Sequence, residues 1–329
     1  MMEPIARRAL ARIPGLAGLL AVLGGLPALA SDGAHGAAPS VASLALWSIS
    51  FAVILLCIAL LPLIHATEHW WEHNRSKLMV SGALALLVCG YYLFRPQGFH
   101  GAPGLASLGT VLSHAVVADY IPFIVLLFSL YTISGGIRLT GDVPAHTGTN
   151  ALILLLGALL ASFIGTTGAS MVLIRPLLQI NSERKHVKHT VIFFIFMVSN
   201  IGGSLLPVGD PPLFLGYLKG VPFLWTLKLW PMWLTATAIL LAVYCALDTY
   251  FYKKEDKASI QLDETRLEPL RLQGKVNFLL LALVVIAVGI LVPDKPFPGT
   301  SWKIPNHLRE VVQLALCGLS MVLTSRQVR

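Results

Sequence analysis

The sequence predicts an all-α protein that crosses a membrane several times. Of its residues, 56% are hydrophobic and only 12% are charged, whereas a soluble domain has about 25% charged residues. Apolar stretches recur along the chain, several of them close to the ~20 residues that a helix needs to cross a bilayer. The net charge of +8 comes from Lys and Arg between these stretches, which is typical of cytoplasmic loops. The lipid bilayer is therefore the predicted partner, and nucleic acid is not.

Residues 1–30 are typical of a signal peptide. Arg7, Arg8 and Arg12 give a basic start, an apolar stretch follows, and Ala28-Leu-Ala matches a cleavage site. An uncleaved first helix is the alternative. In both cases the segment lies outside the predicted functional core.

Three membrane spans are predicted next, at 44–64, 78–94 and 114–137. Residues 95–113 contain Gly and Pro and almost no charge, which fits an external loop with a short amphipathic piece. Residues 138–150 are rich in turn-forming residues, so we expect a connection there.

The segment 151–180 predicts a re-entrant hairpin. Its first apolar stretch, 151–164, is too short to span a bilayer. The sequence Gly-Thr-Thr-Gly follows at 165–168, and a second short apolar stretch follows that. The exit at 181–189 carries Lys and Arg, which predicts a cytoplasmic position.

The segment 190–218 predicts a discontinuous helix. An apolar stretch at 190–198 is interrupted at 199–212 by Gly, Pro and polar residues, and it resumes at 213–218. Glycine permits non-helical backbone and proline removes a donor, so the helix is not expected to continue through the break. Interrupted segments of this kind are typical of the binding sites of secondary transporters.

The rest of the chain contains a further predicted span at 229–247 and a charged cytoplasmic linker at 251–275. Two apolar stretches follow at 276–292 and 308–323. When Ser31 is placed outside, the loops that hold most of the Lys and Arg all fall inside. One orientation therefore fits the whole chain, and we expect a multi-pass protein of the bacterial inner membrane.

Polar residues of the two interrupted segments form the predicted ion-binding site. Na⁺ needs several neutral oxygens close together, and hydroxyls, an amide and unwound carbonyls supply them. The predicted binding residues are Thr166, Thr167, Ser170, Ser199, Asn200, Gly202, Gly203 and Asp210. We expect no cofactor, with Na⁺ and H⁺ as the transported ions.

Asp210 has two alternative interpretations. An ionisable residue at membrane depth is costly and suggests a function, here cation binding or proton exchange. Alternatively, its side chain caps a half-helix that begins at Pro211.

His65, Glu68, His69 and His73 form a pattern that could bind zinc. His-x-x-Glu-His is the pattern of inverted zinc peptidases, and on a helix the three imidazoles share one face. However, Trp70 and its neighbour follow a membrane span directly, which favours an interfacial helix. The protein is therefore not expected to be an enzyme.

The segments 157–176 and 199–212 resemble the ion-transporter superfamily of sodium/proton antiporters, arsenite permeases and citrate or dicarboxylate carriers. The Gly-Thr-Thr-Gly-Ala-Ser tip is most similar to the antiporter branch, whereas Gly-Asp-Pro-Pro is shared with arsenite permeases. The resemblance implies two inverted repeats, a homodimer and an elevator-like moving domain. Under it, 41–250 would be the first repeat and 276–329 the start of a truncated second half.

The leading prediction is thus sodium/proton antiport by alternating access. An anion carrier, for arsenite, citrate or a dicarboxylate, is the alternative within transport. A half-transporter or membrane scaffold without transport activity is the alternative outside it.

Overall fold

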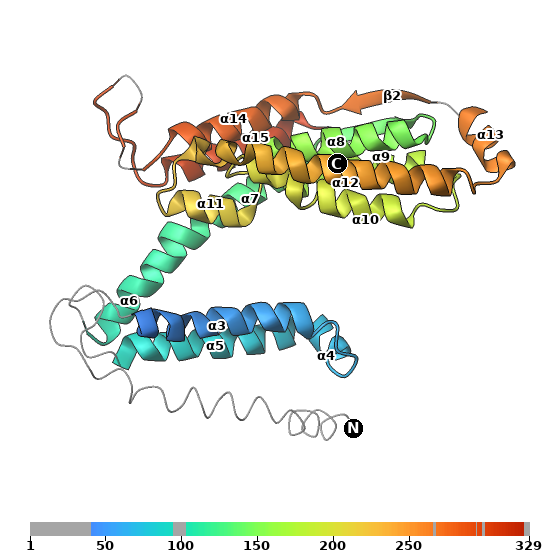
Figure 1. Ribbon diagram of the computed structural model, residues 1–329. Coiled ribbons are helices and arrows are strands. Elements are labelled where there is room, and N and C mark those ends of the chain that lie inside the picture. The colour runs from blue at the N-terminus through green and yellow to red at the C-terminus, as the bar shows by residue number, and fades with distance from the viewer. Residues whose placement is uncertain (1–40, 95–102, 266–267, 294, 298–299, 326–329) are drawn as a thin grey trace. The chain divides into compact units, whose positions relative to one another are not determined.

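The computed structural model of the protein is mostly helical (Figure 1). The described residues are 41–94, 103–265, 268–293, 295–297 and 300–325. The predicted signal peptide lies outside them. Contacts between residues divide the chain into two compact units, which meet in the sequence between Leu112 and Ser113.

The first unit is built on a pair of helices joined by a short one. Its helices are α3 (Val41–Leu60), α4 (Glu68–Glu72), α5 (Asn74–Phe94) and most of α6 (Leu105–Ser113). α3 packs against α5. Large apolar side chains point outward, with Leu86 74% exposed and Phe94 81% exposed. Such a surface is suited to lipid contact.

The third predicted span begins earlier than the sequence suggested. Residues 95–113 were expected to form an external loop with a short amphipathic piece, but α6 continues through a π-helical turn, η2 (His114–Tyr120), into α7 (Ile121–Ser134). Together they form one helix of 30 residues, Leu105–Ser134. Its start follows Gly104, whose φ of +69° does not fit a helix. No proline or charge within α6 ends the helix before the span.

The second unit contains a bundle around a helical hairpin. Its first helices are α8 (Thr147–Ile164), α9 (Thr166–Ile180), α10 (Lys188–Met197), η3 (Ile201–Leu205), α11 (Pro211–Leu218), η4 (Phe223–Leu229) and α12 (Trp230–Tyr252). α8 packs along α9, α12 and η3. Leu154, Leu177 and Phe194 are at most 2% exposed and lie in one apolar core.

α8 is longer than predicted. It begins at Thr147 and has 18 residues, so the argument that this segment is too short to span does not hold. The added turn is polar, and its Thr147 and Asn150 side chains are partnered within the protein. Asn150 and Asn181 exchange two amide hydrogen bonds of 2.8 Å. These tertiary contacts stabilise a helical turn that hydropathy alone did not indicate.

The protein is not wholly helical, which corrects the all-α prediction. The predicted connection and linker pair as an antiparallel two-stranded sheet of β1 (Arg138–Asp142) and β2 (Glu268–Gln273). Between the bundle and β2 lies α13 (Lys257–Thr265). At Gly141, φ is +128°, and a Cβ there would lie 2.7 Å from the Leu270 Cα. Pairing between such distant segments has no local sequence signal.

Two helices close the described chain, α14 (Val276–Ile290) and α15 (Leu308–Leu323). Both pack against α7. Asn277 donates to the Gly136 carbonyl at 2.8 Å and to the Thr324 hydroxyl at 2.9 Å, and it accepts from Ser320 at 2.7 Å. The ends of α7 and α15 therefore lie together beside the start of α14.

Among the described residues, five helices are long and apolar enough to cross a membrane. They are Asn74–Phe94, Leu105–Ser134, Thr147–Ile164, Lys188–Leu205 and Phe223–Tyr252. This supports the prediction of a multi-pass membrane protein.

Candidate functional site

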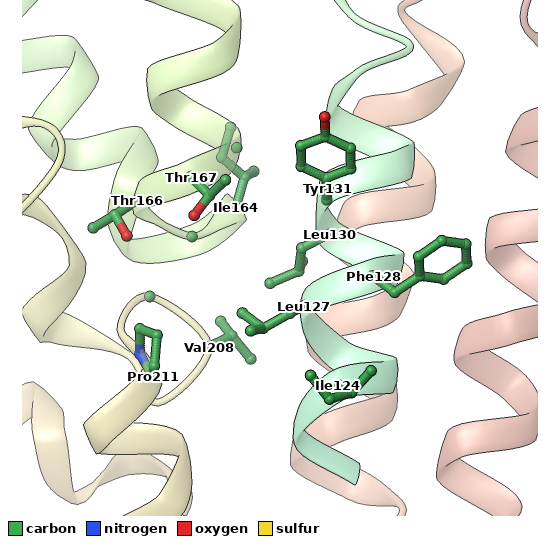
Figure 2. Close-up of a pocket in the computed structure, with 13 residues that line it drawn as sticks. Ile124, Leu127, Phe128, Leu130, Tyr131, Ile164, Thr166, Thr167, Val208 and Pro211 are labelled. Carbon is green, nitrogen blue, oxygen red and sulfur yellow. The ribbon is translucent and has the colours of Figure 1, made fainter. Parts of the chain in front are cut away.

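A cavity of about 350 Å³ lies where the α8–α9 turn meets the interrupted helix and α7 (Figure 2). Figure 2 shows Thr166 and Thr167 at the turn, across from Leu127 and Leu130 of α7, with Val208 and Pro211 on a further side. The lining residues are Ile124, Leu127, Phe128, Leu130, Tyr131, Ile164, Gly165, Thr166, Thr167, Gly168, Val208, Gly209 and Pro211. The walls are mostly apolar, and the polar groups gather at the turn. Ligand sites commonly combine these two features.

The turn between the two helices is made by Gly165. Its φ of 79° and ψ of 151° are open to glycine and strained for other residues. The turn is fastened to the interrupted helix because the Thr166 amide donates to the Gly209 carbonyl at 3.0 Å. The Thr166 side chain is only 9% exposed, and its hydroxyl has no hydrogen-bond partner among the described residues.

The start of α9 supplies backbone donors to the cavity. The first N–H groups of a helix have no acceptor within it. Here the Thr166 N–H donates to the Gly209 carbonyl, while the N–H groups of Thr167 and Gly168 have no acceptor inside α9. Both residues line the cavity. Unpaired N–H groups and the positive end of the helix dipole together favour an anion.

Gly202 and Gly203 serve close backbone packing rather than ligand contact. A Cβ on Gly202 would lie 2.8 Å from the Ala158 Cα, and one on Gly203 would lie 2.6 Å from the Gly209 carbonyl oxygen. The Ser162 hydroxyl donates to the Gly202 carbonyl at 2.5 Å. Glycine is thus needed for η3 to lie directly against α8. Neither Gly202 nor Gly203 lines the cavity.

The remaining predicted residues fall outside the cavity lining. The Ser170 and Ser199 hydroxyls lie 2.8 Å apart and join α9 to the start of the break. Asn200 is exposed, in a non-helical conformation with φ of −130°. The structure therefore brings Thr166 and Thr167 together at the cavity, and Ser170 and Ser199 together outside its lining.

Asp210 stands at the N-cap position of α11, but its side chain makes no capping hydrogen bond. Pro211 and Pro212 at the first two helical positions have no N–H to offer. The carboxylate has no hydrogen-bond or ion-pair partner among the described residues. The capping interpretation is therefore wrong, and Asp210 remains an unpaired, partly buried carboxylate next to two cavity residues.

A buried ionic network was not predicted from the sequence. Asp248 of α12 is fully buried and accepts from Arg184 at 2.7 Å and from the Thr147 hydroxyl at 2.7 Å, with His189 Nε2 also 2.7 Å away. Arg184 lies in the basic loop 181–189, for which a cytoplasmic position was predicted, yet its side chain is only 3% exposed. The sequence signal that could have indicated this network is Asp248 itself, an acidic residue directly after the predicted span 229–247.

Glu255 extends this network just beyond α12. Its carboxylate accepts the backbone N–H groups of Lys185 at 3.0 Å and of His186 at 2.8 Å. Burial raises the pKa of the Glu255 carboxyl, but these hydrogen bonds outweigh burial, so the pKa lies below its usual range. The network thus holds the loop before α10 against the end of α12.

The zinc-binding pattern does not form a site. α4 has only five residues and begins at Glu68, so His65 precedes it and the predicted shared helix face is lost. The His73 ring instead contacts the His69 carbonyl at 2.9 Å. Among the described residues, no group of three or more His, Cys, Asp or Glu could hold a metal ion.

Apolar spans, an interrupted helix and a cavity at the turn of a hairpin are together typical of membrane transporters. The chain matches the protein family described as "Putative citrate transport" over residues 40–329, and it belongs to this family. The family is consistent with the resemblance to the ion-transporter superfamily, in which citrate carriers were one predicted branch. No curated protein gives a significant match to the chain, and no solved structure does either.

Proposed function

We propose that the protein carries a citrate-like carboxylate anion across the membrane and binds it at the turn between α8 and α9. The observation that carries the proposal is the set of unpaired donors in the cavity. The Thr166 hydroxyl and the N–H groups of Thr167 and Gly168, which have no partner among the described residues, all belong to residues that line it. A carboxylate would accept hydrogen bonds from these donors, and the start of α9 favours its charge.

Membership of the citrate transport family supports the anion carrier over the sodium/proton antiport that the turn sequence favoured. The apolar walls from α7 also fit an organic anion better than a bare cation, since they exclude water from the carboxylate and strengthen its hydrogen bonds. Alternating access by an elevator-like movement and assembly as a homodimer are part of the same proposal.

The test is uptake of radiolabelled citrate by liposomes that contain the purified full chain. Thr166→Val replaces the hydroxyl with a methyl group of similar size. A hydrogen bond to a charged group contributes about 1.5–3 kcal/mol, so citrate affinity should fall by roughly tenfold to a hundredfold. The matched control is Thr235→Val, because the exposed Thr235 hydroxyl only bonds the Pro231 carbonyl of its own helix.

Equal affinities in the two variants would contradict the site. Stronger inhibition of citrate uptake by succinate or arsenite than by unlabelled citrate would show that the site prefers a different anion. A correctly inserted protein that takes up no anion would favour the alternative of a membrane protein without transport activity.

A second candidate function, cation exchange, is favoured by the unpaired carboxylate of Asp210. Everted vesicles with an imposed proton gradient and a pH-sensitive dye would test it. Collapse of the gradient on addition of Na⁺, absent in Asp210→Asn, would support antiport. An unchanged gradient in the wild type would rule it out.

A further inference from the structure

The inward face of α15 is polar, and its outward face is apolar. Its buried residues are Arg309, Glu310, Gln313, Cys317 and Ser320, none more than 4% exposed. Facing outward, Val311 is 60% exposed and Val322 is 81% exposed. Ionisable groups placed inside a membrane protein are costly and mark functional positions.

Arg309 and Glu310 form a buried ion pair. Arg309 Nε and Nη2 donate to the same carboxylate oxygen, Glu310 Oε1, at 2.9 and 2.6 Å. The guanidinium also lies over the rings of Phe214 and Tyr217 of α11, 5.7 and 6.0 Å from their centroids. The pair therefore connects α15 to α11.

Three polar atoms of this face have no hydrogen-bond partner in the part of the chain that the structure describes. They are Glu310 Oε2 and both amide atoms of Gln313, which is fully buried. Gln313 lies three residues after Glu310, so the two side chains share a helix face. An amide offers a donor to a carboxylate and an acceptor to a carboxylic acid. Gln313 is thus suited to either protonation state of Glu310.

We propose that Glu310 is a proton-binding site that couples anion transport to protons, with Arg309 as its counter-ion and Gln313 as a positioning residue. A proton from the aqueous phase adds to Glu310 Oε2, and no other bond is made or broken. The pair then changes from net zero to net +1, because Arg309 stays charged. The proposal rests on the proposed function of anion transport.

The charge change reaches the cavity through α11. That helix begins at the cavity residue Pro211, and its Tyr217 hydroxyl donates to the Val288 carbonyl of α14 at 2.6 Å. A positive charge gained beside α11 attracts an anion, and by linkage a bound anion favours protonation of Glu310.

Few other groups are able to compete for this proton. Of the elements packed against α15, α14 carries no titratable residue and α11 carries only Tyr217. α7 carries only Tyr131, which lines the cavity. Within the bounds of these elements and α15, Glu310 is thus the only carboxyl group. Titratable groups at their ends include the N-cap residues Asp210, before α11, and His307, before α15.

The test compares two assays on the full chain in liposomes. Citrate counterflow needs no proton gradient, whereas accumulation driven by an imposed gradient does. Glu310→Gln should keep counterflow and lose accumulation. Its citrate affinity should lose the part of the pH dependence that Glu310 contributes, by a factor within the roughly 5–150-fold range of typical couplings, and keep the part that comes from the ionisation of citrate itself. Glu310→Asp should restore the pH dependence, and the exposed Glu72→Gln is the matched control.

The outcomes separate the two proposals. Absent counterflow in the wild type would overturn anion transport, and this inference with it. Normal counterflow together with gradient-driven accumulation in Glu310→Gln would overturn the inference alone. If Glu310→Gln fails to fold because Arg309 is left unpaired, the charge-neutral double variant Arg309→Met/Glu310→Gln replaces it with the same expected results.

Discussion

The hydroxyl of Ser170 lies 2.8 Å from the hydroxyl of Ser199, across the contact between α9 and the break of the next helix. Two further hydrogen bonds join the α8–α9 hairpin to the same break, from Ser162 of α8 to the Gly202 carbonyl and from the Thr166 amide of α9 to the Gly209 carbonyl. The hairpin and the interrupted helix are therefore fastened together along the length of the break, and we expect them to move as one body.

The serine pair should show energetic coupling in a double-mutant cycle of Ser170→Ala and Ser199→Ala. Each single variant leaves one hydroxyl unpaired, so the coupling should be about 0.5–1.5 kcal/mol. Free energies of unfolding in detergent would measure it. Ser81→Ala is the control, because that hydroxyl bonds its own helix at the Lys77 carbonyl. Additive effects would show that the two hydroxyls do not interact.

Gly203→Ala should destabilise the protein and impair transport. The new methyl group would lie 2.6 Å from the Gly209 carbonyl oxygen and 2.7 Å from the Thr166 Cγ2 atom, so the cavity wall must shift. Overpacking of this kind costs about 1–3 kcal/mol. Gly216→Ala in α11 is the control, with its nearest atom 3.9 Å away. Gly203→Ala should have a lower unfolding temperature and a lower rate of citrate uptake than Gly216→Ala. Equal values in the two variants would contradict the close packing at Gly203.

Breaking the buried pair between Arg184 and Asp248 should be strongly destabilising. Arg184→Met leaves a buried carboxylate without its main counter-ion, which costs about 3–5 kcal/mol. The double variant Arg184→Met/Asp248→Asn should recover much of this loss, because it removes the unpaired charge. Chemical unfolding would measure both. The exposed pair of Lys185 and Asp256 is the control, and Lys185→Ala should leave the unfolding midpoint unchanged. No recovery in the double variant would argue against a charge effect.

Acid should remove the contribution of Glu255 to stability. Burial raises its pKa, but the hydrogen bonds from the Lys185 and His186 amides lower it more, so the folded-state pKa lies below the usual value. Such a group stabilises the fold above its unfolded pKa, and this contribution is lost as the pH falls through the folded pKa. The unfolding temperatures of wild type and Glu255→Gln should therefore differ at neutral pH and converge in acid. A constant difference would contradict the linkage.

Much of the helical architecture could be predicted from local sequence. The helices at 276–292 and 308–323 agree with α14 and α15, and the turn at Gly165 and the break before Pro211 lie where glycine and proline indicated. The span boundaries were less accurate. Residues 95–113 were expected to contain only a short amphipathic piece, whereas α6 is continuous with the span that follows it. The first turn of α8 was assigned to a connection, because hydropathy does not register polar side chains, such as that of Asn150, that find partners inside the fold.

The candidate site was predicted in part. Thr166 and Thr167 do line a cavity, whereas Asn200 and Asp210 do not. Glycine, proline and polar residues within apolar stretches identified the two interrupted segments, but they gave no information on which side chains face each other. The antiport assignment was likewise based on the turn sequence alone, and the family match supports the broader transporter class.

The sequence by itself determined the membrane class, the succession of helices and the two interruptions, because hydropathy and the conformational limits of glycine and proline act locally. Only the tertiary structure decided the burial of Arg184, the missing cap of Asp210 and the inward polar face that carries Glu310. These depend on contacts such as that between Arg184 and Asp248, 64 residues apart. Whether a charge is solvated or paired is set by which distant element packs over it.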